Sequence, residues 1–215
     1  MQIKIHLCKQ IGKDIIMLAV WCVVLISCNN GTDKKENNKG IIMSTSNNFR
    51  GIDHVGITVP DVNAASAFFE KALGAKTLYD VLPEGSKPFE GAETEKELGI
   101  PKASKIVHMR LIQIGNGPTI ELFQFAGAPQ EKAAGLNDYG LQHIAVYVDD
   151  IDAACKQFQA AGGELLSAPH ALANVEDGPN NKGVYGKAPW GTLVEFITYP
   201  DGLKDKSLHR WTPEK

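Results

Sequence analysis

Cysteine is scarce in this 215-residue chain, and neither sign of charge dominates it: there are four cysteines, and the formal net charge is −3. A charge this small gives no electrostatic footprint for nucleic acid. The sequence has no Cys-x-x-Cys pair, no Gly-x-Ser-x-Gly nucleophile elbow and no phosphate-cradling glycine loop after a strand. With 43% hydrophobic and 22% charged residues, the composition is that of an ordinary globular domain.

The first 28 residues differ in pattern from the rest. Three lysines precede an uncharged apolar run over residues 15–26, which is too short to span a bilayer comfortably. This is the layout of a secretory signal peptide. The run ends in Leu25-Ile26-Ser27-Cys28, which resembles the lipobox of bacterial lipoproteins. The resemblance implies a signal peptide over residues 1–27 and acylation of Cys28. The protein would then be exported and held at the membrane of the cell envelope, on its periplasmic or outer-surface side.

Two other readings of this segment stay open. It could be a plain signal anchor, or translation could begin at Met43 and give a cytoplasmic protein. Residues 28–48 are rich in Asn, Lys, Ser and Gly and predict a flexible tether. Beyond that tether Cys155 is the remaining cysteine, so an internal disulfide in the folded part is excluded. We expect Cys155 to be structural, on a helix.

The remaining sequence contains an internal repeat. Residues 53–74 and 142–163 match at a shift of 89 positions, which places His54 on His143. A second match aligns the end of each copy, Gly-Pro-Thr-Ile-Glu121 with Gly-Thr-Leu-Val-Glu195. The repeat predicts a domain over 49–203, made of modules 49–130 and 138–203, with a tail over 204–215. The longer first copy carries extra sequence around 83–103.

Each copy begins with a strand pattern of period two followed by a helix pattern. One strand face is apolar and should pack under the helix, so His54 and His143 belong to the face that the helix leaves open. Asp61 and Asp150 are placed to cap the two helices, which Gly74 and the pair 162–163 should end.

Glu121 and Glu195 each interrupt an apolar strand near the end of a copy. A lone carboxylate in such a position is costly to bury, so its charge needs compensation. One divalent metal would explain both glutamates together with His54 and His143. A single histidine in a strand is usually not a ligand, but four residues at repeat-equivalent positions favour a metal site.

A paired βαβββ module with His on the first strand and Glu on the last resembles the vicinal oxygen chelate superfamily over residues 51–200. The resemblance implies an α+β fold in which two fused modules form one cup-shaped, eight-stranded mixed sheet. It implies that His54, Glu121, His143 and Glu195 hold one metal. This set is similar to that of bacterial glyoxalase I. Nickel, cobalt, zinc or manganese suits it, and iron suits it less.

The implied activity is that of a lyase or isomerase, which moves a proton at a carbon next to a metal-held oxygen of a small α-oxo or α-hydroxy compound. Glu195 is the expected base, with Glu121 as its counterpart on the other face of the substrate. The alternatives are an Fe(II) extradiol-type dioxygenase, against which the fourth ligand Glu121 argues, and a non-catalytic envelope protein that binds a small ligand. A homodimer is compatible with the sequence.

Other polar and aromatic residues receive weaker expectations. His108 and Arg110 share one face of a strand over 105–114, but whether that face meets the cup or solvent stays open. His170 and His209 should lie in a solvated loop and in the tail. Four aromatic residues could line the pocket or belong to plain core: Phe123, Tyr147, Tyr185 and Trp190. Ala188 replaces the Asp that this family usually has in the turn before the last strand.

Overall fold

The computed structural model describes residues 50–214. The predicted signal peptide, the acylated Cys28 and the tether lie outside the described residues. Among the helices of residues 50–214, none is long and apolar enough to cross a membrane. Every statement below concerns this described part of the chain.

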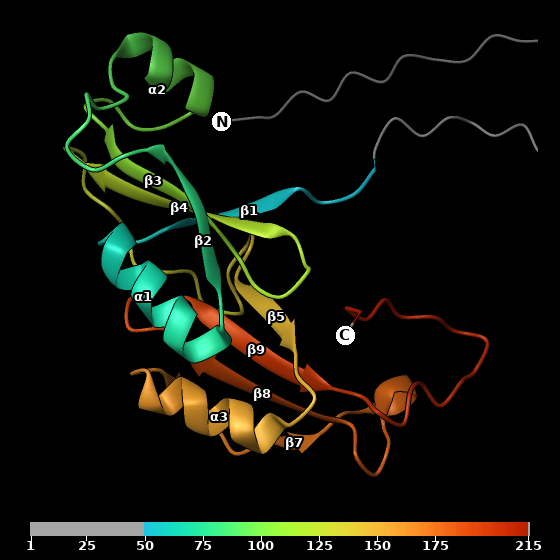
Figure 1. The fold of residues 1–215 in the computed structure, drawn as a ribbon. Helices are drawn as coiled ribbons and strands as arrows, with labels where there is room; N and C mark the ends of the chain where they lie inside the picture. The colour runs from blue at the N-terminus through green and yellow to red at the C-terminus, as the bar shows by residue number, and fades with distance from the viewer. Residues whose placement is uncertain (1–49, 215) are drawn as a thin grey trace, which may run out of the picture. The chain divides into compact units, whose positions relative to one another are not determined.

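The described residues form two sheets, each with a helix of its own module (Figure 1). The elements of the first module, in chain order, are β1 (His54–Thr58), α1 (Val62–Leu73), β2 (Lys76–Leu82), α2 (Ala92–Leu98), β3 (Lys105–Gln113) and β4 (Thr119–Ala126). The elements of the second module are β5 (His143–Tyr147), α3 (Ile151–Ala160), β6 (Glu164–Leu165), β7 (His170–Ala171), the 3-10 turn η1 (Asn174–Glu176), β8 (Lys182–Lys187) and β9 (Leu193–Thr198).

The two modules repeat one topology. The strand order is β1-β4-β3-β2 in the first sheet and β5-β9-β8-β6 in the second, with β7 paired to β8. In each module the first strand pairs in parallel with the last, and the other named pairings are antiparallel. The α+β fold with mixed sheets, which the resemblance implied, is therefore confirmed.

The single eight-stranded sheet expected from the sequence is not what the structure shows. The strands of residues 50–214 form a four-stranded and a five-stranded sheet, and β1 and β5 each lie at an edge of their own sheet. The pairing of first and last strands is local to each module, because both strands belong to the same sheet. Whether β1 then pairs with β5 depends on how the two modules pack together.

The predicted helix ends are largely confirmed. The Asp61 carboxylate accepts a hydrogen bond from the Ala64 N–H, and Asp150 accepts one from the Ala153 N–H. Gly74 ends α1 in the left-handed conformation, with φ of 66°. In the second module the helix stops one residue earlier than expected, at Ala161, and the left-handed Gly162 follows.

The main core is shared by both modules. The apolar faces of α1, α3 and both sheets meet in it, and its buried aromatic rings come from both copies. Phe68 packs edge-on against Phe158 at 5.5 Å and against Trp190 at 5.4 Å. This core positions the two modules by their helix-covered faces, so the opposite faces, which carry the predicted ligands, stay accessible to solvent.

Candidate metal centre

The first predicted ligand pair lies on β1 and β4. Their parallel register places Gly56 opposite Glu121, so His54 lies two residues away on the same side of the sheet as the glutamate. Nε2 of His54 is 3.6 Å from Oε2 of Glu121. The His54 side chain is 45% exposed and that of Glu121 is 15% exposed. The pair therefore lies on an open surface of the first sheet.

The second pair has the same construction on β5 and β9. Ala145 lies opposite Glu195, and His143 lies two residues before Ala145 on the same face of the sheet. Nε2 of His143 is 3.4 Å from Oε2 of Glu195. The His143 side chain, 29% exposed, is more enclosed than that of His54. The two modules therefore share the same arrangement of histidine and glutamate, with nearly equal Nε2–Oε2 distances.

Each pair has its own polar surroundings. Nδ1 of His54 lies 2.8 Å from Oδ1 of Asp53, and because a carboxylate only accepts, the imidazole donates from Nδ1. This hydrogen bond is the main reason that the pKa of His54 is raised above its ordinary value. It leaves Nε2 facing Glu121. Nδ1 of His143, by contrast, is buried with no hydrogen-bond partner in the described part of the chain.

Tyr185 lies beside the second pair. It is directly opposite Glu195 in the β8–β9 ladder, and its ring is 5.4 Å from that of His143 at an interplanar angle of 73°. Its hydroxyl is near the Glu195 carboxylate. Burial raises the pKa of Tyr185, and the Glu195 carboxylate raises it further. Of the four aromatic residues singled out in the sequence, Tyr185 is the one whose ring packs against a predicted ligand in residues 50–214.

The structure brings the four predicted ligands together as two pairs. Within residues 50–214, no group of three or more His, Cys, Asp or Glu side chains is close enough to hold one ion. The separation follows from the two sheets, because each pair belongs to one of them. The four-residue site on a single ion stays a prediction, while each pair is an observed feature of the fold.

A cavity of about 510 Å³ connects surfaces of both modules. Its lining includes Gly56 and Thr58, which share the open face of β1 with His54, and it also includes His143 at the start of β5. A second cavity, of about 840 Å³, borders β5 and the C-terminal segment 210–214. The first cavity therefore offers a small molecule access to both histidine-bearing strands.

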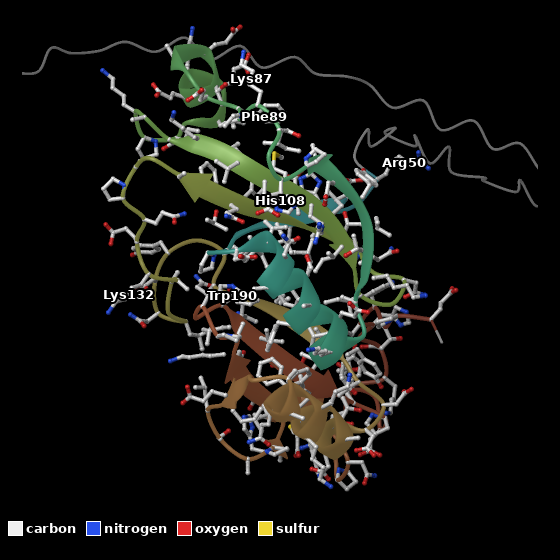
Figure 2. The ribbon with its side chains drawn as sticks, turned by 60° about the vertical axis from the view of Figure 1, so that its left-hand side comes forward. Arg50, Lys87, Phe89, His108, Lys132 and Trp190 are labelled. Atoms are coloured by element: carbon white, nitrogen blue, oxygen red, sulfur yellow. The ribbon has the colours of Figure 1, made fainter. Side chains whose placement is uncertain are left out.

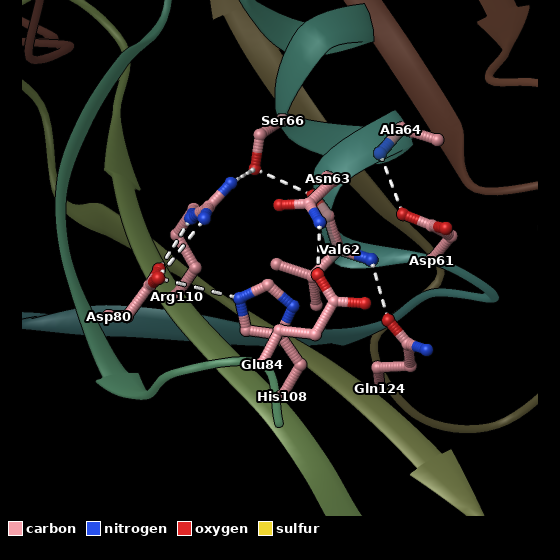
Figure 3. Close-up of polar contacts among 10 residues, drawn as sticks. All are labelled: Asp61, Val62, Asn63, Ala64, Ser66, Asp80, Glu84, His108, Arg110 and Gln124. Atoms are coloured by element: carbon pink, nitrogen blue, oxygen red, sulfur yellow. Dashed lines mark hydrogen bonds and ion pairs between the residues drawn. The ribbon is translucent and has the colours of Figure 1, made fainter. Parts of the chain in front are cut away.

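His108 and Arg110 face neither the predicted ligands nor solvent. Arg110 lies under α1, where it donates two hydrogen bonds to Asp80, of 2.5 and 3.1 Å, and one to Ser66 (Figure 3). His108 is 1% exposed, with Nε2 3.5 Å from Oδ2 of Asp80. Figure 2 labels His108 close to α1. Asp80, which was not singled out in the sequence, is the carboxylate that joins these two side chains. The Arg110 hydrogen bond lowers the pKa of Asp80.

The remaining predictions divide between core and surface. Trp190 packs against Phe68 and Phe69 at the border of the core, and it also lines the cavity of about 510 Å³. Phe123 stacks with Phe125, and Tyr147 packs against Tyr199. Cys155 is buried on helix α3, and its position on a helix is as expected. His209 is exposed as expected. His170 is exposed too but lies in β7, a two-residue strand, where a loop was expected.

The turn before β9 forms without the usual Asp. The Ala188 N–H donates to the Thr192 carbonyl, and the Gly191 N–H donates to the Ala188 carbonyl. Backbone hydrogen bonds therefore close the turn. Trp190 adds a side-chain bond from Nε1 to the Thr192 hydroxyl, of 2.7 Å.

Comparison with known proteins gives a consistent result. The sequence profile of the glyoxalase/bleomycin resistance protein/dioxygenase superfamily matches residues 53–178. A 2-epi-5-epi-valiolone epimerase from Actinomyces sp. is 30% identical over 155 residues, which cover 70% of this chain and 80% of the epimerase. A solved glyoxalase family protein from Bacillus cereus is similar in fold, with a TM-score of 0.56 and 20% identity over 72% of this chain and 97% of that protein.

Proposed function

Because this chain belongs to the glyoxalase/bleomycin resistance protein/dioxygenase superfamily, we propose that it is a metal-dependent enzyme of the glyoxalase-like, isomerase or lyase kind. The observation that carries the proposal is the duplicated His–Glu pair, with equivalent atoms 3.6 and 3.4 Å apart. The proposed reaction is proton transfer at a carbon next to an oxygen of a small α-oxo or α-hydroxy compound. The name of the Actinomyces relative, an epimerase, supports this reaction type.

The residues present fit a divalent cation. Two ligand atoms in adjacent positions on one ion, each about 2.1 Å from it, are roughly 3.0 to 3.6 Å apart for bond angles of about 90 to 118°. The Nε2–Oε2 distances in both pairs lie in this range. Two imidazoles and two carboxylates suit nickel, cobalt, zinc or manganese. The bound cation would supply Lewis acidity toward the substrate oxygen.

The two carboxylates supply the proton chemistry in this proposal. Glu195 takes the proton from the substrate carbon on one face, and Glu121 serves the opposite face. Two carboxyl groups on opposite faces are what inversion of a carbon centre requires: the ionised one takes the proton from one face, and the other, starting protonated, delivers its own proton to the opposite face.

For one ion to have all four ligands, the two pairs must meet. We propose that a second copy of the chain supplies the missing pair, so that each site combines His54 and Glu121 of one copy with His143 and Glu195 of the other. Two observations support this arrangement over closure within one chain. The shared core fixes the modules against each other, and the strands that carry the histidines, β1 and β5, are edge strands.

Metal analysis of the purified protein tests the function. We expect one nickel, cobalt, zinc or manganese ion per chain, and we expect it to be lost from the double variant His54→Ala, Glu195→Ala. His170→Ala is the matched control, because His170 is exposed on β7. Bound iron would favour the dioxygenase alternative instead. Wild-type protein that takes up no metal at all would favour a non-catalytic binding protein.

We also propose that the protein is an exported lipoprotein anchored at Cys28, which the Leu25-Ile26-Ser27-Cys28 sequence supports. Labelling of growing cells with a clickable fatty acid tests this. Wild-type protein should carry the label in the membrane fraction, and Cys28→Ser should not. Label on both proteins, or on neither, would contradict the anchor.

A further inference from the structure

The duplication makes the two ligand pairs comparable position by position, and one neighbour differs in kind. In the first module the residue directly opposite Glu121 on the adjacent antiparallel strand is Leu111. In the second module the residue in that place, opposite Glu195, is Tyr185. Directly opposed residues on neighbouring strands contact each other through their side chains. The second pair therefore has a hydroxyl beside its carboxylate where the first has an aliphatic side chain.

Tyr185 contacts both members of the second pair. Its ring meets the His143 ring edge to face at 5.4 Å, and its hydroxyl is near the carboxylate of Glu195, which lies directly opposite it in the ladder. Two residues earlier on the same strand is Gly183, where a Cβ would lie at an ordinary contact distance of 3.7 Å from Oε1 of Glu195, so this side of the carboxylate meets backbone without a side chain. Glu195 is thus bordered by an imidazole, a phenol and a bare stretch of backbone.

The first pair has different support. Leu111 cannot hydrogen-bond to Glu121, and the polar neighbour of His54 is Asp53, whose side chain is 91% exposed. Water competes for a hydrogen bond at such an exposed position, so it orients the imidazole weakly. Ligands whose outer partners fix them in place bind a cation better than ligands that must first be ordered.

We propose that Tyr185 is a positioning residue that holds Glu195 and His143 in place for a divalent cation, and that the second pair is therefore the stronger half of the metal site. The inference rests on the proposed function and adds a role that the repeat alone does not assign. It makes the two halves of a duplicated site unequal: the second pair captures the ion, and the first completes its coordination.

Co²⁺ binding to the full-length protein tests this without a substrate. Tyr185→Phe keeps the ring and removes the hydroxyl, and we expect it to weaken Co²⁺ affinity by about 10-fold or more, the usual scale for loss of an outer partner. The visible absorption spectrum of bound Co²⁺ should also change, because the ligand geometry is less fixed. Tyr147→Phe is the matched control: Tyr147 lies on β5 with His143 but packs against Tyr199. It should leave affinity and spectrum unchanged.

The outcomes separate the inference from the proposed function. Wild-type protein that binds no Co²⁺ would overturn both. If wild type binds and Tyr185→Phe matches it in affinity and spectrum, the metal site stands and the role of Tyr185 is wrong. A fall in the unfolding temperature of metal-free Tyr185→Phe as large as that of Tyr185→Leu would assign the tyrosine to packing.

The inequality of the two pairs has its own test. His143→Ala should lose more Co²⁺ affinity than His54→Ala. The reverse order would refute the claim that the second pair binds the ion more strongly.

Discussion

Nε2 of His143 lies 3.4 Å from Oε2 of Glu195, and the equivalent atoms of His54 and Glu121 are 3.6 Å apart on the other sheet. The two distances agree although 67 residues separate the first pair in sequence and 52 separate the second. The geometry comes from the parallel pairing of first and last strands, which is the same in both modules. Insertions between those strands leave it unchanged.

The shared-site proposal makes a prediction about mixed subunits. His54→Ala and His143→Ala should each weaken Co²⁺ binding, so that neither variant is occupied at a Co²⁺ concentration that just saturates the four-ligand site of wild type. When the two variants are co-expressed, a heterodimer would combine the intact first pair of one copy with the intact second pair of the other. Affinity-tagged heterodimer should therefore recover about half of the wild-type Co²⁺ stoichiometry. If each chain closed its own site, the mixture would recover none, and binding would fail in every combination.

The ion pair between Asp80 and Arg110 predicts a pH dependence of stability. Hydrogen bonding by Arg110 lowers the pKa of Asp80 from its ordinary value of 3.8, so the ionised form stabilises the fold above that value. The contribution is lost as the pH falls through the lowered pKa. Asp80→Asn should be less stable at neutral pH by about 2 kcal/mol, the scale of a hydrogen bond to a charged group. Its stability should then fall less than that of wild type below pH 3.8.

Urea unfolding at several pH values measures this. Asp177→Asn is the control, since Asp177 pairs with Lys204 at 2.5 Å while its side chain is 44% exposed. An exposed pair contributes under about 1 kcal/mol. Parallel pH profiles for wild type and Asp80→Asn would contradict the prediction.

Substitution of Gly186 by a residue with a side chain should disturb the packing of the second module. A Cβ at this position would lie 2.6 Å from Cε1 of Phe158 and 2.9 Å from the Glu164 carbonyl oxygen, so Gly186→Ala must displace a core ring or a neighbouring strand. We expect a loss of about 1 to 3 kcal/mol in unfolding free energy. Gly117→Ala, whose Cβ would meet only the Ile114 carbonyl at an ordinary 3.5 Å, should change stability little. Equal effects in denaturant titrations would count against this account.

The two N-terminal helix caps, one in each module, give the same prediction about stability twice. Asp61→Ala and Asp150→Ala each remove a carboxylate that accepts a backbone N–H, at 2.8 and 2.9 Å. Each should cost about 1 kcal/mol, and Asp→Asn at the same position should cost less because the amide oxygen still accepts. Chemical denaturation of the four variants checks this. An Ala variant as stable as wild type would show that the cap contributes nothing at that helix.

Much of each module could be predicted from the sequence, because the signals are local. The strand pattern that begins at His54, the capping Asp61 and the helix stop at Gly74 all depend on neighbours a few residues away. The facing of the glutamates also followed from period two. The structure adds the distance between His and Glu, which depends on the register of two strands far apart in sequence.

Other features of the structure could not be predicted from the sequence, for physical reasons. Helix α2 lies where only extra sequence was expected: it has no buried residue, so it has no apolar stripe to show. The face of His108 could not be decided because a bulge between Ile106 and His108 reverses the alternation in β3. Ile106 packs with Met109, and His108 turns toward α1. The division into two sheets depends on contacts between modules, which no pattern within one strand encodes.

The core shared by the two modules has a consequence for how the chain reaches this structure. Phe68 of the first module is buried against Phe158 and Trp190 of the second, both of which lie much later in the sequence. A first module without the second would leave this apolar surface of α1 uncovered. The earlier copy therefore reaches its final state only together with the later one.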